Sequence, residues 1–74
     1  MVKDKPQISL GAAIRRRREA LKISQDSFAE MIEMHRTYYS AIERGEKNMT
    51  VQTLLQIAAG LRTKVADLFR EAGY

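Results

Sequence analysis

The chain has 74 residues, no cysteine and a formal net charge of +4. That length allows one domain around one modest hydrophobic core, and the lack of cysteine excludes a disulfide-stapled scaffold. No apolar run approaches the roughly 20 residues that a membrane-spanning helix needs. The charged first residues are also not followed by the apolar stretch of a signal peptide. We therefore expect one small domain with no membrane partner.

Basic charge is concentrated near the start of the chain. Residues 1–23 hold seven basic and two acidic side chains, whereas residues 24–49 hold three basic and five acidic ones. Nucleic acids attract basic surfaces because the bound cations release condensed counterions. Since many small domains reach a charge of +4, the charge permits a nucleic-acid partner without establishing one.

Apolar residues recur at helical spacing along the whole chain, and no alternating run indicates a strand. The sequence therefore predicts an all-α fold with five helices. The first helix is expected from Ser9, which would serve as its N-cap, to Leu21. Its expected inner face consists of Leu10, Ala13, Ile14 and Leu21.

Only two residues separate the expected second and third helices. The second should open at Ser24, whose hydroxyl can accept a hydrogen bond from a free amide of the first turn, and run to about Glu33. The third should run from Arg36 to Arg44, and Gly45 follows it where a left-handed C-cap is favourable. The residues of the second helix expected to face the core are Phe28, Ala29, Met31 and Ile32.

Thr50 is expected to cap a fourth helix, and a short fifth helix should run from about Lys64 to Glu71. The short connections are typical of a compact helical bundle. We divide the chain into an N-terminal arm, residues 1–7, and a folded domain, residues 8–71. The residues expected to face inward are Val51, Leu54, Leu55, Ile57, Ala58 and Leu61 in the fourth helix, and Val65, Leu68 and Phe69 in the fifth.

The expected third helix has two different faces. Tyr39 and Ile42 are placed to pack against the second helix, so we expect Tyr39 to be buried. The opposite face is short and polar, with a guanidinium at its N-terminal end. Such a helix can enter the major groove of DNA, where arginine can donate two hydrogen bonds to guanine. The outward residues are Arg36, Thr37, Ser40 and Ala41, with Tyr38 and Arg44 at the edges.

Several motifs together resemble the helix-turn-helix family of phage Cro and repressor proteins. They are Leu10-Gly11, Ile14-Arg15, Leu21-Lys22-Ile23-Ser24-Gln25, Phe28-Ala29, Ile42-Glu43-Arg44-Gly45, Thr53-Leu54-Leu55-Gln56-Ile57-Ala58 and Asp67-Leu68-Phe69. Within that family, Arg36-Thr37-Tyr38, Ser40 and Asn48-Met49-Thr50 are similar to the controller proteins of restriction–modification systems. The resemblance covers about residues 8–70 and implies a sequence-specific, DNA-binding transcriptional regulator.

The resemblance also implies which residues contact DNA. Gln25 matches a position at the start of the second helix that holds a phosphate. A second group matches base-reading positions, and we expect Tyr38 beside it, on the DNA side. A third group lies where the loop after the recognition helix meets the DNA backbone. The base-reading group is Arg36, Thr37 and Ser40, and the backbone group is Arg44, Lys47 and Asn48.

A structural ion pair and three departures from the family pattern follow from the same comparison. The family pairs a cation at the position of Arg18 with a glutamate at the position of Glu43, so we expect a partly buried ion pair between them. Glu33 stands where a turn glycine is usual, which predicts a non-glycine residue in an unfavourable conformation. Arg62 replaces another common glycine, after the fourth helix. His35 replaces the usual serine or threonine N-cap of the recognition helix, and we expect it to serve as a cap.

The resemblance implies a homodimer in the cytoplasm that binds palindromic operators upstream of its own gene and of the endonuclease gene, with RNA polymerase as a further candidate partner. Affinity for a palindrome requires two recognition helices about 34 Å apart. The candidate interface residues, which could equally belong to the core, are Leu55, Ala59, Val65 and Phe69.

Other functions have less support in the sequence. One histidine, His35, cannot build the usual zinc site, and no carboxylate pairs with a nucleophile or a phosphate loop. We therefore predict no catalytic residue, no metal and no cofactor. The alternatives are a phage-type repressor, an antitoxin-like protein-interaction module and a non-specific nucleic-acid binder. The polar, basic Arg36-Thr37-Ser40 face argues against the interaction module.

Overall fold

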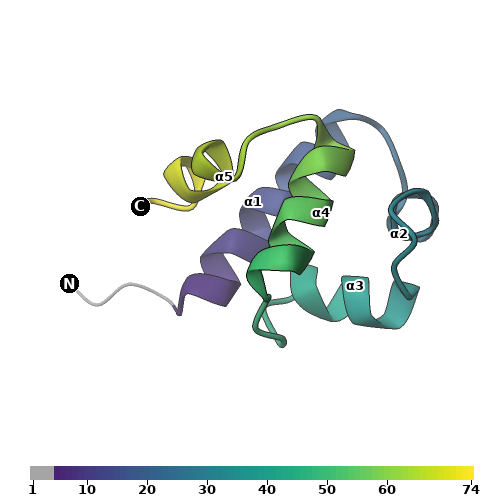
Figure 1. The fold of residues 1–74 in the computed structure, drawn as a ribbon, viewed down its shortest axis with the longest axis horizontal. Coiled ribbons are helices and arrows are strands. Elements are labelled where there is room, and N and C mark those ends of the chain that lie inside the picture. The colour runs from purple at the N-terminus through teal and green to yellow at the C-terminus, as the bar shows by residue number, and fades with distance from the viewer. Residues whose placement is uncertain (1–4) are drawn as a thin grey trace.

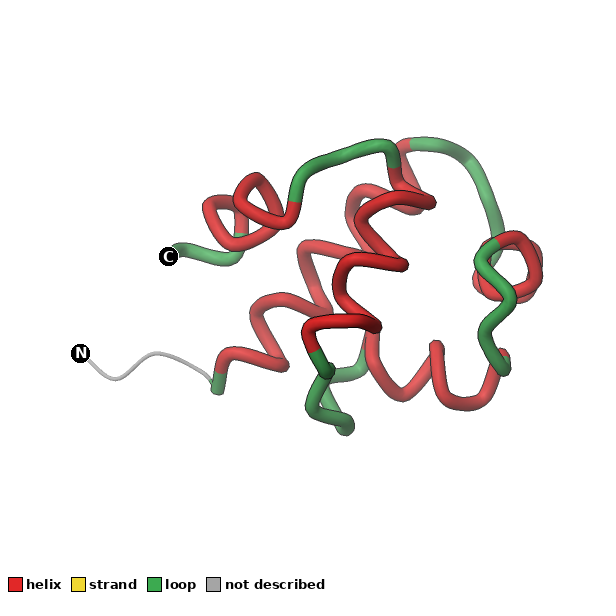
Figure 2. Tube along the Cα trace, viewed as in Figure 1, coloured by secondary structure: helices red, strands yellow, loops and turns green. Residues whose placement is uncertain are grey.

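The computed structural model describes residues 5–74, which form five helices and no strand (Figures 1 and 2). This confirms the predicted all-α class. The predicted N-terminal arm, residues 1–7, falls mostly outside the described residues. No helix within residues 5–74 is long and apolar enough to cross a membrane. The helices are α1 (Pro6–Ala20), α2 (Gln25–Met31), α3 (Arg36–Glu43), α4 (Val51–Leu61) and α5 (Val65–Glu71).

Helices α1 and α4 pack side by side in the middle of the molecule (Figure 1). Helices α2 and α3 pack against each other on one side, where α3 also packs across the N-terminal half of α1. Helix α5 lies on the other side against α1 and α4. The Arg17 Nε atom on α1 donates a hydrogen bond to the Glu71 carboxylate on α5 over 2.8 Å. The helix-turn-helix pair thus projects from a two-helix support.

Each helix contributes at least one fully buried large side chain to a single core, and α3 contributes two. The rings of Phe28 and Tyr39 lie 5.2 Å apart, centroid to centroid, and join α2 to α3. Burial of such side chains is the main stabilising term in so small a domain, at roughly 1.5–3 kcal/mol each. The six side chains are Ile14, Phe28, Tyr39, Ile42, Ile57 and Leu68, all with 0% exposure.

Three of the four predicted N-caps are present, at Ser24, His35 and Thr50. The Ser24 hydroxyl accepts a hydrogen bond from the Ser27 amide over 3.1 Å, and the Thr50 hydroxyl accepts one from the Thr53 amide over 3.0 Å. The prediction for α1 is wrong, because the helix begins three residues before Ser9, at Pro6. Proline suits the first helical position, where its missing N–H would have had no intrahelical partner.

Four apolar residues that we predicted to face inward are exposed instead. Leu21 and Met31 lie at the C-terminal ends of α1 and α2 and are 44% and 52% exposed. Val51 and Leu55 lie one turn apart on the side of α4 that faces away from the core, with exposures of 76% and 56%. A helix buries one stripe only, and apolar residues on both sides of α4 cannot all lie in it.

The backbone is strained at the two positions where the sequence lacks the usual glycine. Glu33, as predicted, lies in the left-handed region with φ 57°, and Arg62 lies there too, with φ 58°. Lys22, which the sequence analysis did not single out, is also left-handed, with φ 60°. At Gly11, by contrast, the constraint is space, because an added Cβ would lie 2.3 Å from the carbonyl oxygen of Ile42. Gly11 therefore sets the close approach of α1 to α3.

Candidate nucleic-acid interface

The start of α3 is held by an unusual cap. The His35 Nδ1 atom accepts a hydrogen bond from the Thr37 amide over 3.3 Å, in place of the hydroxyl that serine or threonine would offer. Behind it, the Met34 amide donates to the Ala29 carbonyl over 2.8 Å across the tight turn at Glu33. The departures at Glu33 and His35 therefore leave the α2–α3 turn intact.

A buried carboxylate fixes the other end of α3 to α1. The Glu43 Oε2 atom accepts a hydrogen bond from Arg18 Nε over 2.7 Å, and Oε1 accepts one from Arg18 Nη2 over 3.1 Å. The Arg18 and Glu43 side chains are only 9% and 1% exposed. Arg18 also donates from Nη1 to the Ile23 carbonyl over 2.7 Å. This is the ion pair expected from the sequence, and it is more deeply buried than expected.

Two further donors complete the Glu43 cluster, which we define as Arg18, Gln25, Tyr39 and Glu43. The Gln25 Nε2 atom donates to Glu43 Oε1 over 2.8 Å, and the Tyr39 hydroxyl donates to Glu43 Oε2. The sequence predicted that Tyr39 is buried but gave no sign of its hydroxyl bond. Gln25, assigned from the resemblance to a DNA phosphate, is half-buried, and its amide binds Glu43.

The cluster also controls ionisation. Burial alone would raise the pKa of Glu43, but hydrogen bonds from Arg18, Gln25 and Tyr39 outweigh it and hold that pKa below its usual value. Burial, helped by the hydrogen bond to Glu43, raises the pKa of the Tyr39 hydroxyl. Glu43 is therefore ionised and Tyr39 neutral at neutral pH, which is the state that makes every bond of the cluster.

The outer face of α3 borders a shallow hollow of about 230 Å³ between α2 and α3. At one end, Arg36 Nη1 donates to Asp26 Oδ2 over 3.1 Å, and both side chains are largely exposed, at 70% and 67%. The hollow brings together two of the residues predicted to contact the DNA backbone and three of the four predicted base readers. Its lining consists of Gln25, Asp26, Arg36, Thr37, Ser40 and Arg44.

At the other end, each guanidinium nitrogen of Arg44 donates one hydrogen bond within the protein. Its Nε and Nη2 atoms donate to the two Glu46 carboxylate oxygens over 3.0 and 3.1 Å, and its Nη1 atom donates to the Ser40 hydroxyl. Hydrogen bonding to Glu46 raises the pKa of Arg44, and hydrogen bonding to Arg44 lowers the pKa of Glu46. The partners Asp26 and Glu46 were missed in the sequence, although its acidic excess over residues 24–49 was a sign of them.

The remaining predicted contact residues differ in exposure. Lys47 and Asn48 are exposed in the loop after α3. Tyr38 is half-buried and packs against the core, so only part of its ring is open to a partner. The prediction for Ala41, which we placed on the outer face, is wrong, because this residue is buried at 6% exposure. Its small side chain belongs to the packing of α3.

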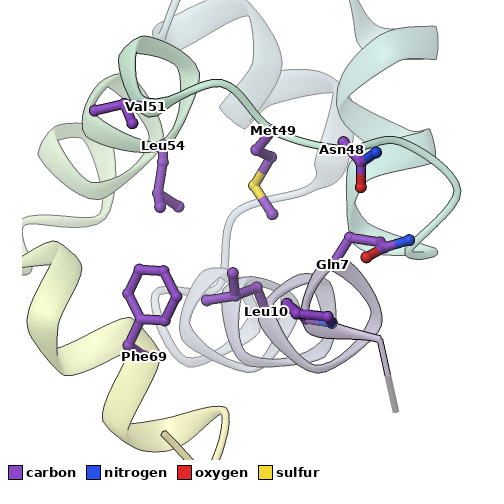
Figure 3. Close-up of a pocket in the computed structure, with 8 residues that line it drawn as sticks. Gln7, Leu10, Asn48, Met49, Val51, Leu54 and Phe69 are labelled. Atoms are coloured by element: carbon purple, nitrogen blue, oxygen red, sulfur yellow. The ribbon is translucent and has the colours of Figure 1, made fainter.

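The predicted interface residues separate into two pairs. Leu55 and Ala59 are exposed on α4, whereas Val65 and Phe69 are half-buried against the core of their own chain. Phe69 points toward Leu54 and, with Leu10 and Met49, lines an apolar hollow of about 470 Å³ between α1, α4 and α5 (Figure 3). The structure therefore leaves Leu55 and Ala59 as the more accessible candidates.

The comparisons agree with this architecture. Residues 14–68 match the helix-turn-helix family. The chain is 44% identical over 55 residues to the control protein C.MunI of a Mycoplasma species, covering 74% of each protein. It is 38% identical over 64 residues to the control protein C.SmaI of Serratia marcescens, covering 86% of this chain and 76% of that protein. The chain belongs to the helix-turn-helix family, among the control proteins.

Solved structures share the fold over nearly the whole chain. The clp gene regulator ClgR of Corynebacterium glutamicum is 30% identical with a TM-score of 0.91, and the match covers 96% of this chain and 91% of that one. The restriction–modification controller protein C.Esp1396I, solved as a tetramer with its natural 35-base-pair operator, is 26% identical with a TM-score of 0.83. That match covers 95% of this chain and 92% of the other.

Proposed function

We propose that this protein is a sequence-specific, DNA-binding transcriptional regulator that controls a restriction–modification system. The observation that carries the proposal is the outer face of α3. This face is polar, largely exposed and carries the guanidinium groups of Arg36 and Arg44, while the buried Glu43 cluster fixes the helix that presents it. The 44% identity to a control protein supports the same function. We further propose RNA polymerase as a partner and the cytoplasm as the location.

Within this function, the residues around the hollow have separate tasks. Arg36, at the N-terminal end of α3, reads a base through its guanidinium, and Thr37 and Ser40 tune neighbouring positions. A second set of side chains contacts the DNA backbone, and these contacts position the protein without reading the base sequence. This set consists of Gln25, Arg44, Lys47 and Asn48, with Tyr38 at the edge of the groove.

We propose that the active form is a homodimer joined through the outer side of α4. Val51, Leu55 and Ala59 follow one another at four-residue spacing and are all exposed, so they form one apolar stripe. Val65 and Phe69 lie in the adjoining helix and extend the candidate interface. A dimer presents two copies of α3, which a palindromic operator requires. The controller protein C.Esp1396I on its operator is likewise an oligomer.

A binding titration tests the function. The DNA upstream of the protein's own gene is compared with a scrambled duplex of the same length and composition, at several salt concentrations. We expect roughly a thousandfold or greater preference for the upstream DNA. Equal affinity for both duplexes would indicate a non-specific binder. No binding to either would favour a protein-interaction module.

Light scattering tests the dimer. Leu55→Glu places a charge in the proposed stripe and should shift the protein to monomers, with a matching loss of operator affinity, because a buried unpaired charge is costly. Met31→Glu is the matched control, since Met31 is similarly exposed, at 52%, but lies on α2. Equal oligomeric states for the wild-type protein and the Leu55 variant would contradict the proposed interface.

A further inference from the structure

Asp26 holds the one basic side chain on the outer face of α3 that we propose reads a base. It lies in the first turn of α2, ten residues before Arg36, and the short turn between the helices brings the two side chains together. The bond uses one nitrogen of the guanidinium, Nη1, at 3.1 Å from Asp26 Oδ2. Among the described residues Arg36 has no other side-chain hydrogen bond, so the N–H groups of its Nε and Nη2 atoms remain available to a ligand.

The free edge of Arg36 is the one that recognition needs. The Nε and Nη2 atoms of a guanidinium donate two parallel hydrogen bonds, which match the paired O6 and N7 acceptors of guanine. A carboxylate on Nη1 limits the orientations of the guanidinium without occupying that edge. Arg44 is the contrasting case, because its Nε and Nη2 atoms donate hydrogen bonds to Glu46 and its Nη1 atom donates one to Ser40. Of these two arginines, Arg36 alone is held in a form ready to read a base.

We infer that Asp26 is a positioning residue that sets specificity by holding Arg36 for a bidentate contact with guanine. This inference rests on the proposed function. In free solution the pair is highly exposed and water weakens it. Where DNA binding displaces water from around the pair, the same pair strengthens. The Asp26 carboxylate also repels DNA phosphates, so it disfavours complexes in which Arg36 contacts the backbone instead of a base.

Asp26→Asn tests the inference, because it keeps the shape of the side chain and removes its charge. We expect lower discrimination between bases and higher affinity for non-specific DNA. Discrimination at the base pair that Arg36 reads should fall by about three- to tenfold, as part of the contact's full value. Affinity for scrambled DNA should rise by about twofold or more, because a repulsive charge is gone. Both are measured by titrating the operator, its single-base variants and the scrambled duplex.

Two comparisons separate positioning from a general charge effect. Glu30→Gln removes a charge from the same helix, at an exposed residue with no ion pair in the described chain. It should leave discrimination unchanged at every base pair. In an Arg36→Ala background, Asp26→Asn should cause no further loss of discrimination, because the side chain that it positions is absent.

The outcomes also separate this inference from the proposed function. If the wild-type protein prefers its upstream DNA and Asp26→Asn discriminates as the wild type does, the role of Asp26 is overturned and the proposed function stands. The role of Asp26 is likewise overturned if Asp26→Asn lowers discrimination equally in the Arg36→Ala background. If the wild-type protein shows no preference for its upstream DNA, the proposed function fails, and the role of Asp26 fails with it.

Discussion

Helix α3 is flanked by two arginine–carboxylate pairs that use the same chemistry in opposite surroundings. In the Glu43 cluster, Arg18 Nε lies 2.7 Å from the carboxylate, and the two side chains are 9% and 1% exposed. On the outer face, Arg36 Nη1 lies 3.1 Å from Asp26, and the side chains are 70% and 67% exposed. The bond lengths are similar, so it is burial that separates the two roles.

Burial decides whether a pair can exchange partners. Removing either member of a buried pair leaves a charge without water or a counterion, so the Glu43 cluster is fixed as long as the protein is folded. An exposed pair contributes little to stability in water, so its members can form contacts with DNA instead. One pair therefore holds α3 against α1, and the other is free to respond to a ligand at the opposite face of the same helix.

The largest expected effect comes from Glu43→Ala. The substitution strands the buried Arg18 guanidinium and removes the acceptor of Tyr39 and Gln25. We expect a loss of about 3–5 kcal/mol in the free energy of unfolding, measured by urea denaturation. Glu46→Ala, which breaks an exposed pair with Arg44, should change that free energy by no more than about 0.5 kcal/mol.

If Glu43→Ala does not fold, a second variant can test the same comparison. Replacing Arg18 and Glu43 together by leucine removes both charges, and it should recover much of the lost stability. Equal small losses for Glu43→Ala and Glu46→Ala would contradict the division between a fixed and an exchangeable pair.

The next effect concerns binding. Arg36→Ala should cost about 1–3 kcal/mol and relax preference at one base pair per half-site, because it removes a bidentate contact. Lys47→Ala should weaken all DNA sequences alike and lower the slope of log affinity against log salt by about 1. Both residues are exposed, so the free energy of unfolding should barely change. A uniform loss of affinity in Arg36→Ala, with discrimination intact, would make Arg36 a phosphate contact.

Much of the fold followed from the sequence because its signals are local. Helical spacing, the Ser24 and Thr50 caps and Gly45 after α3, with φ 75°, each depend on a few neighbouring residues. The same signals failed where tertiary packing decides. Val51 and Leu55 lie on the outer side of α4, and nothing in their own helix distinguishes them from its buried residues.

The candidate site was predictable in part for the same reason. The family pattern indicated Arg18 and Glu43, and the outward position of Arg36, Thr37 and Ser40 follows from helical geometry. The partners of these side chains did not follow from it. Asp26 contacts Arg36 only because the α2–α3 turn brings the start of α2 close to the start of α3. This proximity depends on the tertiary structure and does not follow from either helix alone.

Acid should destabilise the fold mainly through the buried pair of Arg18 and Glu43. Because the pKa of Glu43 is lower in the folded protein than in the unfolded chain, its contribution to stability is present above the unfolded pKa of about 4.3. That contribution is lost as the pH falls through the lower, folded pKa. We expect the free energy of unfolding to decrease from about pH 4 downward, as measured by urea denaturation across pH. Glu46→Gln should change this profile only slightly, because the pair of Glu46 with Arg44 is exposed. A profile that changed mainly with Glu46 would place the acid response on the exposed face.

The smallest effect comes from the α4–α5 turn, which belongs to neither pair and serves as a reference for both. Arg62 is exposed, ends α4 in the left-handed conformation with φ 58°, and has a Cβ that disfavours it. Arg62→Gly removes this strain, about 1–2 kcal/mol, but increases the freedom of the unfolded chain by about 0.4–1 kcal/mol. We expect a net stabilisation of up to about 1 kcal/mol by thermal unfolding, with operator discrimination unchanged. Arg62→Ala keeps the Cβ and removes the same charge, so it should not stabilise. Equal stabilities for the glycine and alanine variants would show that the charge, and not the backbone, matters at this turn.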